Sequence, residues 1–487
     1  MKQMNRRHFL KAGAVAGAVA AFPAPALIAR GANEVVRIGM IGLGGRTDIL
    51  IPAVNQAPNA KLVSICDPDA TRLGARREKW GVEKAHADLR KVIEDKDIDA
   101  VVVATCNQWH CLAGIWAMQA GKHVYVEKPL CLSFWEGEQL VKAAKKYNRL
   151  CQIGTQMRTD EAFRPVAQKF LHEEKALGKI QSVRVNRFWV RRPIGKRATP
   201  LEIPKTVDYN LWLGPSQDVP IYRNQLQYDW HWMWNTGNGE TGNWGAHLLD
   251  DCRNDIFLDK IRVPKRVMVS GGRVGMNDAG ESPNMMVTYF DTGEIPVIFA
   301  ICGLEDKNER RSVGPRKGPV HGYIAYCEGG IYEKHWGHAV VYDNDGKEVR
   351  RFEATSEHAG GFVHMQNFAD AIQAGDAAKL NAPIQVGYDS SCWYNAANFA
   401  YRLAGAFSKE KALSVPNTGK MEDILNTMEQ YMATQEIPMN AETFRLSPML
   451  ELDEKTYRFV GDHAAEANAL AEMRPGRGEF VVPEVTL

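Results

Sequence analysis

The sequence lacks paired cysteines at the spacing of a metal site or a redox centre. Its nine cysteines are scattered, their number is odd, and no two of them form a CxxC pair. A zinc site or a disulfide framework therefore has no support, and we expect no metal. Because several of the cysteines stand in apolar, strand-like runs, we expect buried thiols that pack as small hydrophobic side chains.

The chain also lacks an excess of charge of either sign. Lys and Arg number 60 against 58 for Asp and Glu, so the formal net charge is only +2. This balance gives no general attraction to nucleic acid or to an anionic membrane and favours small molecules or proteins as partners. Beyond the N-terminal region, no segment reaches the roughly 18 uninterrupted apolar residues of a membrane span, so we expect none in the mature protein.

The N-terminus has the features of a twin-arginine export signal. Arg6 and Arg7 precede Phe9-Leu10-Lys11, and a mildly apolar run rich in Ala and Gly follows as far as Ala29. A loose basic tail is the alternative, but it would not require this order of features. We therefore expect a periplasmic protein, with the signal either cleaved or kept as a tether. Since this route carries folded proteins, any bound small molecule would be acquired in the cytosol.

Residues 36–67 have the pattern of a dinucleotide-binding unit. An apolar strand leads into Gly42-Leu43-Gly44-Gly45-Arg46-Thr47, a helix is expected next, and a second strand over residues 62–66 ends at Asp67. A strand before the glycines, a helix after them and an acid at the end of the next strand are the context that the motif requires. An ordinary glycine turn in an α/β core is the alternative.

Each residue of this motif has a physical role in binding a nucleotide. Gly42 permits the tight turn, Gly44 lets the backbone approach a pyrophosphate, and the helix turns its free N–H groups toward the negative charge. Asp67 would hold a ribose hydroxyl; no basic residue follows it directly, which favours NAD, while Arg72 leaves NADP open. Thr47 stands where the third glycine of GxGxxG is expected, and the sequence does not explain it.

Strands and helices continue to alternate up to about residue 154. The strand at residues 98–105 is apolar enough to be covered on both faces, as in a parallel sheet. The pattern therefore predicts an α/β fold whose N-terminal part is a doubly wound parallel sheet with helices on both faces. Further elements are expected over residues 112–120 (helix), 122–127 (strand), 134–147 (helix) and 150–154 (strand).

From about residue 155 the pattern becomes that of an α+β domain with an open, mostly antiparallel sheet. Strand candidates are separated by clear turns, among them Asp291-Thr292-Gly293 and Asn344-Asp345-Gly346. Helices over residues 362–374 and 391–403 are expected to cover one face of this sheet. A helix over residues 421–434 and an irregular tail, wrapping the domain or a neighbouring subunit, are expected to follow.

Glu127-Lys128-Pro129 lies just beyond a strand of the first sheet, at the edge where such sheets bind ligands. With Gly42-Leu43-Gly44-Gly45-Arg46, Asp67, Ala104-Thr105 and the α+β domain, it makes nearly the whole mature chain resemble the glucose-fructose oxidoreductase and inositol dehydrogenase family, Gfo/Idh/MocA. The resemblance implies a Rossmann domain, an NAD(P)-dependent sugar dehydrogenase acting on CH–OH, and a homodimer or homotetramer. It also implies cofactor contacts from Gly45, Arg46, Thr105, Trp109, His110, Glu127 and Lys128.

These boundaries divide the chain into four expected regions. They are a twin-arginine signal region (1–32), a Rossmann domain (33–157), an α+β substrate and oligomerisation domain (158–415), and a C-terminal helix with a wrapping tail (416–487).

Lys128 is the residue that we expect to act on the substrate hydroxyl. In the family that the chain resembles, this lysine touches both the substrate hydroxyl and the nicotinamide region. It can donate to the hydroxyl, or accept from it as a neutral amine if burial or the nicotinamide charge lowers its pKa. A surface charge at a helix start is the alternative.

Residues 237–250 contain a second cluster with Asn243 and His247. Their spacing of four puts both side chains on one helix face. The resemblance implies an Asp and a His here that point at the substrate, with the His assisting proton transfer. Asn243 departs from that pattern, because an amide takes up no proton at a useful pH and can only orient the substrate or the lysine. We therefore expect His247 to be the base, with Lys128 as its partner; a buried core histidine is the alternative.

Aromatic and basic residues give a tentative set of substrate contacts. If residues 228–234 form a strand, Trp230 and Trp232 share one face, and flat indoles suit a sugar ring; packing in a core or a subunit interface is the alternative. Arg158 and Tyr222 complete the set.

The sequence thus predicts an exported oxidoreductase that transfers hydride between a tightly held nicotinamide cofactor and a secondary hydroxyl or ketone of a sugar or glycoside. Two alternatives stay open. One is NAD-dependent glycoside cleavage by transient oxidation and elimination, although relatives with that chemistry tend to lack the Glu-Lys-Pro triplet. The other is a non-catalytic sugar-binding protein that keeps its cofactor, which Asn243 and Thr47 would permit.

Overall fold

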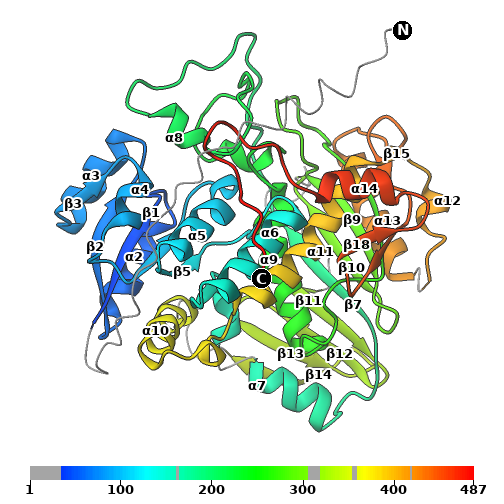
Figure 1. Ribbon diagram of the computed structural model, residues 1–487. Coiled ribbons are helices and arrows are strands. Elements are labelled where there is room, and N and C mark those ends of the chain that lie inside the picture. Colours follow the sequence, from blue (N-terminus) through cyan, green and yellow to red (C-terminus); the bar gives the residue numbers. More distant parts are fainter. Residues whose placement is uncertain (1–34, 161–163, 305–317, 354–358, 417–418) are drawn as a thin grey trace.

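The computed structural model describes residues 35–160, 164–304, 318–353, 359–416 and 419–487. These residues form two sheets with their helices, and the chain crosses between the two more than once (Figure 1). The signal region expected at residues 1–32 lies outside the described residues. So do the first three residues of a helix that the sequence pattern also favours over residues 161–174.

The first sheet is the predicted doubly wound sheet. All its neighbouring strands are parallel, in the order β3-β2-β1-β4-β5-β6. The carboxyl ends of β1, β2, β4 and β5 therefore meet at one edge, where a ligand is expected. The strands are β1 (Val36–Ile41), β2 (Ala60–Cys66), β3 (Lys84–His86), β4 (Ala100–Val103), β5 (His123–Val126) and β6 (Cys151–Ile153). The helices are α2 (Thr47–Gln56), α3 (Ala70–Trp80), α4 (Leu89–Glu94), α5 (His110–Gln119) and α6 (Phe134–Lys146).

Helix α6 begins with two side-chain hydrogen bonds that fix the chain just after Glu127-Lys128-Pro129. Ser133 Oγ accepts from the backbone N–H of Glu136 (3.3 Å), and Glu136 Oε2 accepts from the N–H of Leu132 (3.2 Å). The first bond caps a free N–H of the first helical turn, and the second holds the residue before the cap. The segment that carries Lys128 is therefore held between the end of β5 and a well-defined helix start.

The second sheet has 12 strands and is mixed but mostly antiparallel, as predicted. Its central strand β7 (Ile180–Phe188) is parallel to β10 (Val297–Cys302) and antiparallel to β11 (His321–Cys327). The other strands are β8 (Arg266–Gly272), β9 (Met285–Asp291), β12 (Gly330–Lys334), β13 (His338–Tyr342), β14 (Glu348–Glu353), β15 (Gly405–Ala406), β16 (Arg445–Leu446), β17 (Leu450–Asp453) and β18 (Arg458–Val460).

Two long helices cover one face of this sheet, α9 (Gly239–Ile256) and α11 (Ile384–Arg402), and their apolar residues join those of α5 and α6 in one core. Helix α13 (Gly419–Thr434) covers the other face along β8, β9 and β10. Shorter elements are α7 (Arg164–Ala167), the π-helical turn η3 (Gln168–Glu173), α8 (Tyr209–Leu213), α12 (Lys409–Ala412), α14 (Ala464–Ala471), and the 3-10 turns η1 (Asn107–Trp109), η2 (Gln156–Thr159), η4 (Asp229–Trp232) and η5 (Ala377–Lys379).

Helix α10 (Ala359–Ala374) does not cover the second sheet, contrary to the prediction. Its residues Met365 and Phe368 pack with Ile38 of β1 and Ile51 of α2 in the core of the first domain. Apolar periodicity shows which face of a helix is buried but not which sheet the face meets. A helix more than 300 residues beyond β1 therefore completes the first domain.

The C-terminal tail was expected to be irregular, and this prediction is wrong. After α13 it forms β16, β17 and β18, which extend the second sheet from β8, and then helix α14. These strands are two to four residues long, too short to show the alternation that identifies a strand.

All nine cysteines are free thiols, eight of them buried and Cys106 partly exposed. Among the described residues no helix combines the length and the apolar character needed to cross a membrane. Within the same ranges no cluster of three or more His, Cys, Asp and Glu side chains could hold a metal ion.

Candidate active site

The turn after β1 has the form of a dinucleotide cradle. Gly42 has a φ of +88°, and a Cβ there would lie 2.6 Å from the carbonyl oxygen of Ala104, so no other residue fits. A Cβ on Gly44 would meet nothing closer than 3.6 Å, and one on Gly45 nothing within 4 Å. The backbone of these two glycines is therefore open to a ligand on that side.

Thr47 closes the same turn. Its hydroxyl donates to the carbonyl of Gly44 at 2.7 Å, and its backbone N–H donates to the same oxygen at 3.1 Å. The side chain is fully buried at the first residue of α2. Thr47 thus replaces the third glycine of the motif with a side chain that holds the turn itself.

Asp67 lies at the carboxyl end of β2, beside the cradle. Its Oδ2 accepts from the N–H of Leu43 (2.8 Å) and its Oδ1 from the N–H of Asp69 (2.9 Å). Burial raises the pKa of this carboxyl, against these two hydrogen bonds. Arg72 of α3 lines the same pocket, with Nε 3.8 Å from Asp69 Oδ2.

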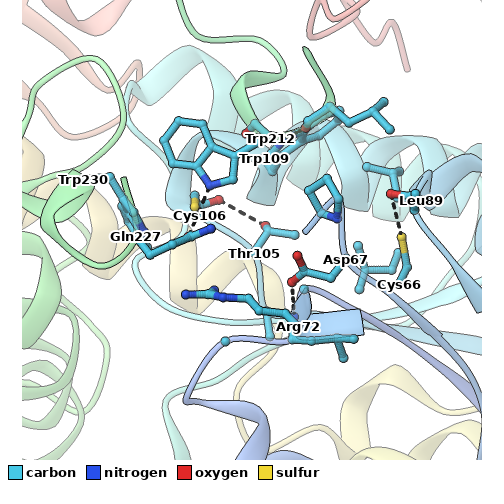
Figure 2. A pocket seen from close by; sticks show the side chains of 18 residues that line it. Cys66, Asp67, Arg72, Leu89, Thr105, Cys106, Trp109, Trp212, Gln227 and Trp230 are labelled. Carbon is cyan, nitrogen blue, oxygen red and sulfur yellow. Dashed lines mark hydrogen bonds between the residues drawn. The ribbon is translucent and has the colours of Figure 1, made fainter. Parts of the chain in front are cut away.

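The cradle and Asp67 line one pocket that is partly open to solvent. Figure 2 shows Asp67, Arg72, Gln227 and Trp230 around it. Its walls come from the ends of β1, β2 and β4 on one side and from Leu211, Trp212, Gln227 and Trp230 on the other.

Residues 201–230, here called the cap, supply that second wall. The N–H of Ala70 donates to the carbonyl of Thr206, and the N–H of Asp208 donates to the carbonyl of Pro68, both at 2.9 Å. Trp109 Nε1 donates to the carbonyl of Leu211 at 2.9 Å. The cap is therefore joined to the first domain at both edges of the pocket.

The last residues of the chain, 474–487, here called the latch, return over the cap and over helices α5 and α6 (Figure 1). Arg477 donates from Nε to the carbonyl of Gly214 (3.1 Å) and from Nη1 to Asn210 Oδ1 (2.6 Å). Phe480 packs edge-on against the ring of Trp109, 5.2 Å between centroids. Because Trp109 also lines the pocket, the latch and the pocket share a wall.

Lys128 follows β5, and the Lys128–Pro129 peptide bond is cis. Lys128 Nζ donates to two atoms of Asn243 on α9, the backbone oxygen at 2.8 Å and Oδ1 at 3.0 Å. Asn238, just before α9, fixes the position of this helix relative to the segment after Lys128. Its Nδ2 donates to the carbonyl of Cys131 (3.0 Å). The first sheet and α9 thus bring Lys128 and Asn243 together.

Burial lowers the pKa of Lys128 to about 8. The positive charges of Arg46 and Arg187 lower it further, while the carboxylates of Glu127 and Glu240 oppose that shift. A lysine in this state exists as both amine and ammonium near neutral pH, which is what proton transfer with a hydroxyl requires.

His247 lies one turn after Asn243 on α9 and is buried. Its Nδ1 has no hydrogen-bond partner among the described residues. Burial holds the pKa of this imidazole well below its usual value, and the charge of Lys128 adds to the effect. The ring is therefore a neutral group with one buried nitrogen left for a ligand.

Glu127 and His110 tie the cradle to the lysine. Arg46 Nε pairs with Glu127 Oε1 at 2.8 Å. The ring of His110 lies between two carbonyl oxygens, Nδ1 at 2.7 Å from that of Pro129 and Nε2 at 3.2 Å from that of Thr105. His110 therefore holds the loop after β4 against the segment after β5.

The tentative substrate contacts fall in different places. Arg158 is buried and pairs with Asp250 (Nε to Oδ2, 2.6 Å) and with Asp259 (Nη1 to Oδ2, 2.7 Å), so it supports the base of α9 and does not line the pocket. Tyr222 is 43% exposed on the surface and does not line the pocket either.

Residues 228–234 do not form the strand that the sequence analysis considered. Residues Asp229–Trp232 form the 3-10 turn η4, entered through Tyr228 at a φ of +67°, which is incompatible with extended backbone. Trp230 and Trp232 therefore share no sheet face. Trp230 lines the nucleotide pocket and stacks on His231 at 3.7 Å between ring centroids, and Trp232 is buried.

Sequence reasoning missed three charged residues beside Lys128. Glu240, one turn before Asn243, accepts from Arg187 Nε at 2.7 Å and from Arg191 Nε at 3.1 Å. The spacing of three between Glu240 and Asn243 is visible in the sequence. The two arginines stand on and after β7, where no local motif marks them.

Comparison with known proteins gives a consistent result over most of the chain. Residues 36–155 match the oxidoreductase family, NAD-binding Rossmann fold, and residues 166–418 match its C-terminal alpha/beta domain. Residues 3–23, outside the described residues, match the twin-arginine translocation pathway signal sequence. The chain therefore carries an NAD-binding Rossmann domain and a signal for export by the twin-arginine route.

Individual relatives are more distant. The chain is 33% identical over 150 residues to myo-inositol 2-dehydrogenase of Thermotoga maritima, a match that covers 31% of this chain and only 44% of that protein. It is 35% identical over 307 residues to levoglucosan dehydrogenase of Pseudarthrobacter phenanthrenivorans, covering 61% and 70%. The fold is similar to a solved levoglucosan dehydrogenase in complex with NADH, with a TM-score of 0.56, 15% identity, and coverage of 85% and 100%.

Proposed function

The chain belongs to the Gfo/Idh/MocA oxidoreductase family, and on that premise we propose that it transfers hydride between a tightly held NAD and a secondary hydroxyl or ketone of a sugar or glycoside. The observation that carries this proposal is the pair of hydrogen bonds from Lys128 Nζ to Asn243. An amine nitrogen has four tetrahedral positions, one for the side chain and three for protons or a lone pair. Asn243 takes two of the three, and the third is left for a substrate hydroxyl.

The residues present fit a nicotinamide dinucleotide. The open backbone of Gly44 and Gly45, the start of α2 and the carboxylate of Asp67 would hold its phosphates and a ribose. Bound NAD would supply the acceptor for the hydride in oxidation and, when reduced, the donor in reduction.

Lys128 and His247 would handle the proton and the orientation of the substrate. In oxidation the neutral amine of Lys128 takes the hydroxyl proton, and in reduction its ammonium gives the proton to the carbonyl oxygen. His247 remains neutral in either direction, since its pKa is far below its usual value. Its unpartnered Nδ1 would bind a neighbouring hydroxyl of the substrate. In this proposal His247 orients the substrate, whereas the sequence predicted that it is the base.

The cap and the latch support the proposal that the nucleotide is held tightly. Leu211, Trp212, Gln227 and Trp230 would stand over it, and Arg477 joins the cap to the end of the chain. An exported protein benefits from such closure, because free nucleotide is scarce outside the cytoplasm.

We further propose the division of labour that the sequence suggested. Residues 33–157 would hold the cofactor, residues 158–415 the substrate and a subunit contact in a homodimer or homotetramer, and residues 416–487 would close the cofactor site. The periplasm is the proposed location, which the twin-arginine signal supports.

Two measurements test this function on the purified protein. Denaturation followed by mass spectrometry should release NAD or NADH in near-stoichiometric amount. Addition of inositols, levoglucosan and keto-sugars should change the nicotinamide absorbance near ~340 nm. A nucleotide-free protein that gains no activity with added NAD would overturn the proposal. Phenol released from an aryl glycoside without any acceptor would instead indicate elimination.

A further inference from the structure

We propose that Glu240 is a positioning residue for the reaction, and that Glu240 and Asn243 act as one matched unit that holds Lys128. The inference rests on the proposed function for the role of Lys128. Glu240 would fix the direction of the Asn243 amide and supply, from one helical turn away, the negative charge that this amide lacks.

The hydrogen bonds of Asn243 can run in one direction only. Its Oδ1 accepts from Lys128 Nζ at 3.0 Å, and its Nδ2 donates to Glu240 Oε2 at 3.3 Å. An ammonium group offers only donors and a carboxylate only acceptors, and an amide, which has one end of each kind, can join them. The carboxylate of Glu240 therefore determines which end of Asn243 faces the lysine.

Glu240 is itself held rigidly. It is buried, Oε1 accepts from Arg187 Nε at 2.7 Å and from Arg191 Nη2 at 3.1 Å, and Oε2 accepts from Arg191 Nε at 3.1 Å. All of these donors require an oxygen. A glutamine would turn one N–H2 group toward an arginine or toward Asn243, where no acceptor stands.

The same geometry explains why residue 243 is not an aspartate. With Glu240 Oε2 at 3.3 Å from the amide nitrogen, a carboxylate at residue 243 would place two negative charges in contact. Such a pair keeps a proton that neither group would keep alone. Residues 240 and 243 are therefore matched, and the carboxylate belongs on one of them only.

Charged and titratable groups face Lys128 from five elements. Glu127 follows β5, Arg46 precedes α2, Arg187 stands on β7, and α9 contributes Glu240 and His247; His231 of η4 also senses its charge. Within this set Glu240 is the one carboxylate that reaches the lysine through a bridging side chain.

The test uses the full-length protein and measures the pH at which Lys128 becomes reactive. An amine-specific acylating reagent is applied over a pH series, and modification of the Lys128 peptide is quantified by mass spectrometry. The variants are E240Q, N243D and the double variant E240Q/N243D. D291N is the matched control, since it removes a carboxylate partner of Arg266 at the far end of β9.

Removing the charge of Glu240 should lower the midpoint of labelling by about one pH unit, because the ammonium loses a favourable neighbour. N243D should lower the melting temperature and raise the midpoint. E240Q/N243D should recover most of the stability lost by either single variant, since the new amide at residue 240 can donate to the new carboxylate at residue 243 and still accept from an arginine. D291N should leave the midpoint unchanged.

Additive losses in the double variant, or an E240Q midpoint equal to that of D291N, would overturn the proposal. If E240Q does not fold, E240D replaces it in the test. This variant keeps the charge but shortens the side chain, so it should weaken the bridge to Asn243 and also lower the midpoint of labelling. An unshifted E240D midpoint would overturn the proposal. Labelling needs no substrate, so it stays informative if no sugar is oxidised. A sugar oxidised normally by E240Q, with unchanged pH profile, would overturn the positioning role alone and leave the proposed function intact.

Discussion

Arg477 Nη1 lies 2.6 Å from Asn210 Oδ1. Arg477 is the tenth residue before the last, and this contact joins it to the cap over the nucleotide pocket. A second nitrogen of the same guanidinium, Nη2, donates to the backbone oxygen of Asn210 at 2.7 Å. These hydrogen bonds therefore join the latch to the residue that precedes Leu211, which lines the pocket.

Arg477→Ala should make the bound nucleotide leave faster. The loss of several charge-assisted hydrogen bonds of about 1.5–3 kcal/mol each should accelerate release by roughly tenfold or more. Retention of nucleotide after dilution, followed over time by fluorescence of the reduced form, is the measurement. Arg458→Ala, which removes only an exposed pair with Glu472, is the control. Equal release rates for the two variants would contradict a latch.

Lys128→Met should abolish turnover and leave nucleotide binding intact. The change removes the group that exchanges the substrate proton, a contribution of about 10²- to 10⁴-fold. Nucleotide content after purification and steady-state kinetics with an accepted sugar separate the two effects. A variant with parental kcat would show that the proton leaves by another route.

The rate of sugar oxidation should rise with pH through about 8. Burial lowers the pKa of Lys128 to about 8, and only the neutral amine can accept the hydroxyl proton, so the active form increases above this value. Carbonyl reduction, which needs the ammonium, should fall over the same interval. Profiles of kcat/KM in both directions check the sign, and two profiles that rise together would rule out Lys128 as the shared proton group.

The free energy of unfolding should depend on pH because the pKa of Lys128 is lowered in the folded protein. Between the folded-state value near 8 and the ordinary value of 10.5, the unfolded chain binds more protons at Lys128 than the folded chain does. This group alone therefore makes stability increase with pH in that interval. Comparison of denaturant unfolding for the parent and Lys128→Met at a series of pH values isolates the contribution.

Thr47→Val should destabilise the cradle. The substitution keeps the shape of the side chain but removes the hydroxyl that donates to Gly44, at a cost of about 1 kcal/mol and with weaker nucleotide binding. Thermal unfolding and titration of NAD into nucleotide-free protein give both values. Thr427→Val is the control, because its hydroxyl makes a comparable bond to Asp423 on the exposed side of α13.

The first sheet could be predicted from the sequence because its signals are local. Strand β4 is uniformly apolar, and Gly42 and Asp67 stand at fixed places relative to their strands. The family pattern pointed to Lys128, Asn243 and His247, and the spacing of four put Asn243 and His247 on one face of a helix. The sequence left open whether Asn243 would orient the substrate or the lysine, and the hydrogen bonds from Lys128 to Asn243 come from the fold.

The cap, the latch and the role of Arg158 could not be predicted in this way. The cap is a long connection with little periodicity, and its position depends on backbone hydrogen bonds to Pro68 and Ala70. Arg158 looks like any basic residue until the fold brings Asp250 and Asp259 to it. Such long-range pairs leave no pattern in a single sequence.

The packing of α10 on β1 and α2 also determines when the cofactor domain can be completed during synthesis. A nascent chain that has emerged only as far as β6 has every strand of the nucleotide site, but Ile38 and Ile51 still lack the side chains of Met365 and Phe368 that cover them. Burial of such side chains contributes about 1.5–3 kcal/mol each. The ribosome must therefore add more than 200 further residues before this domain is closed.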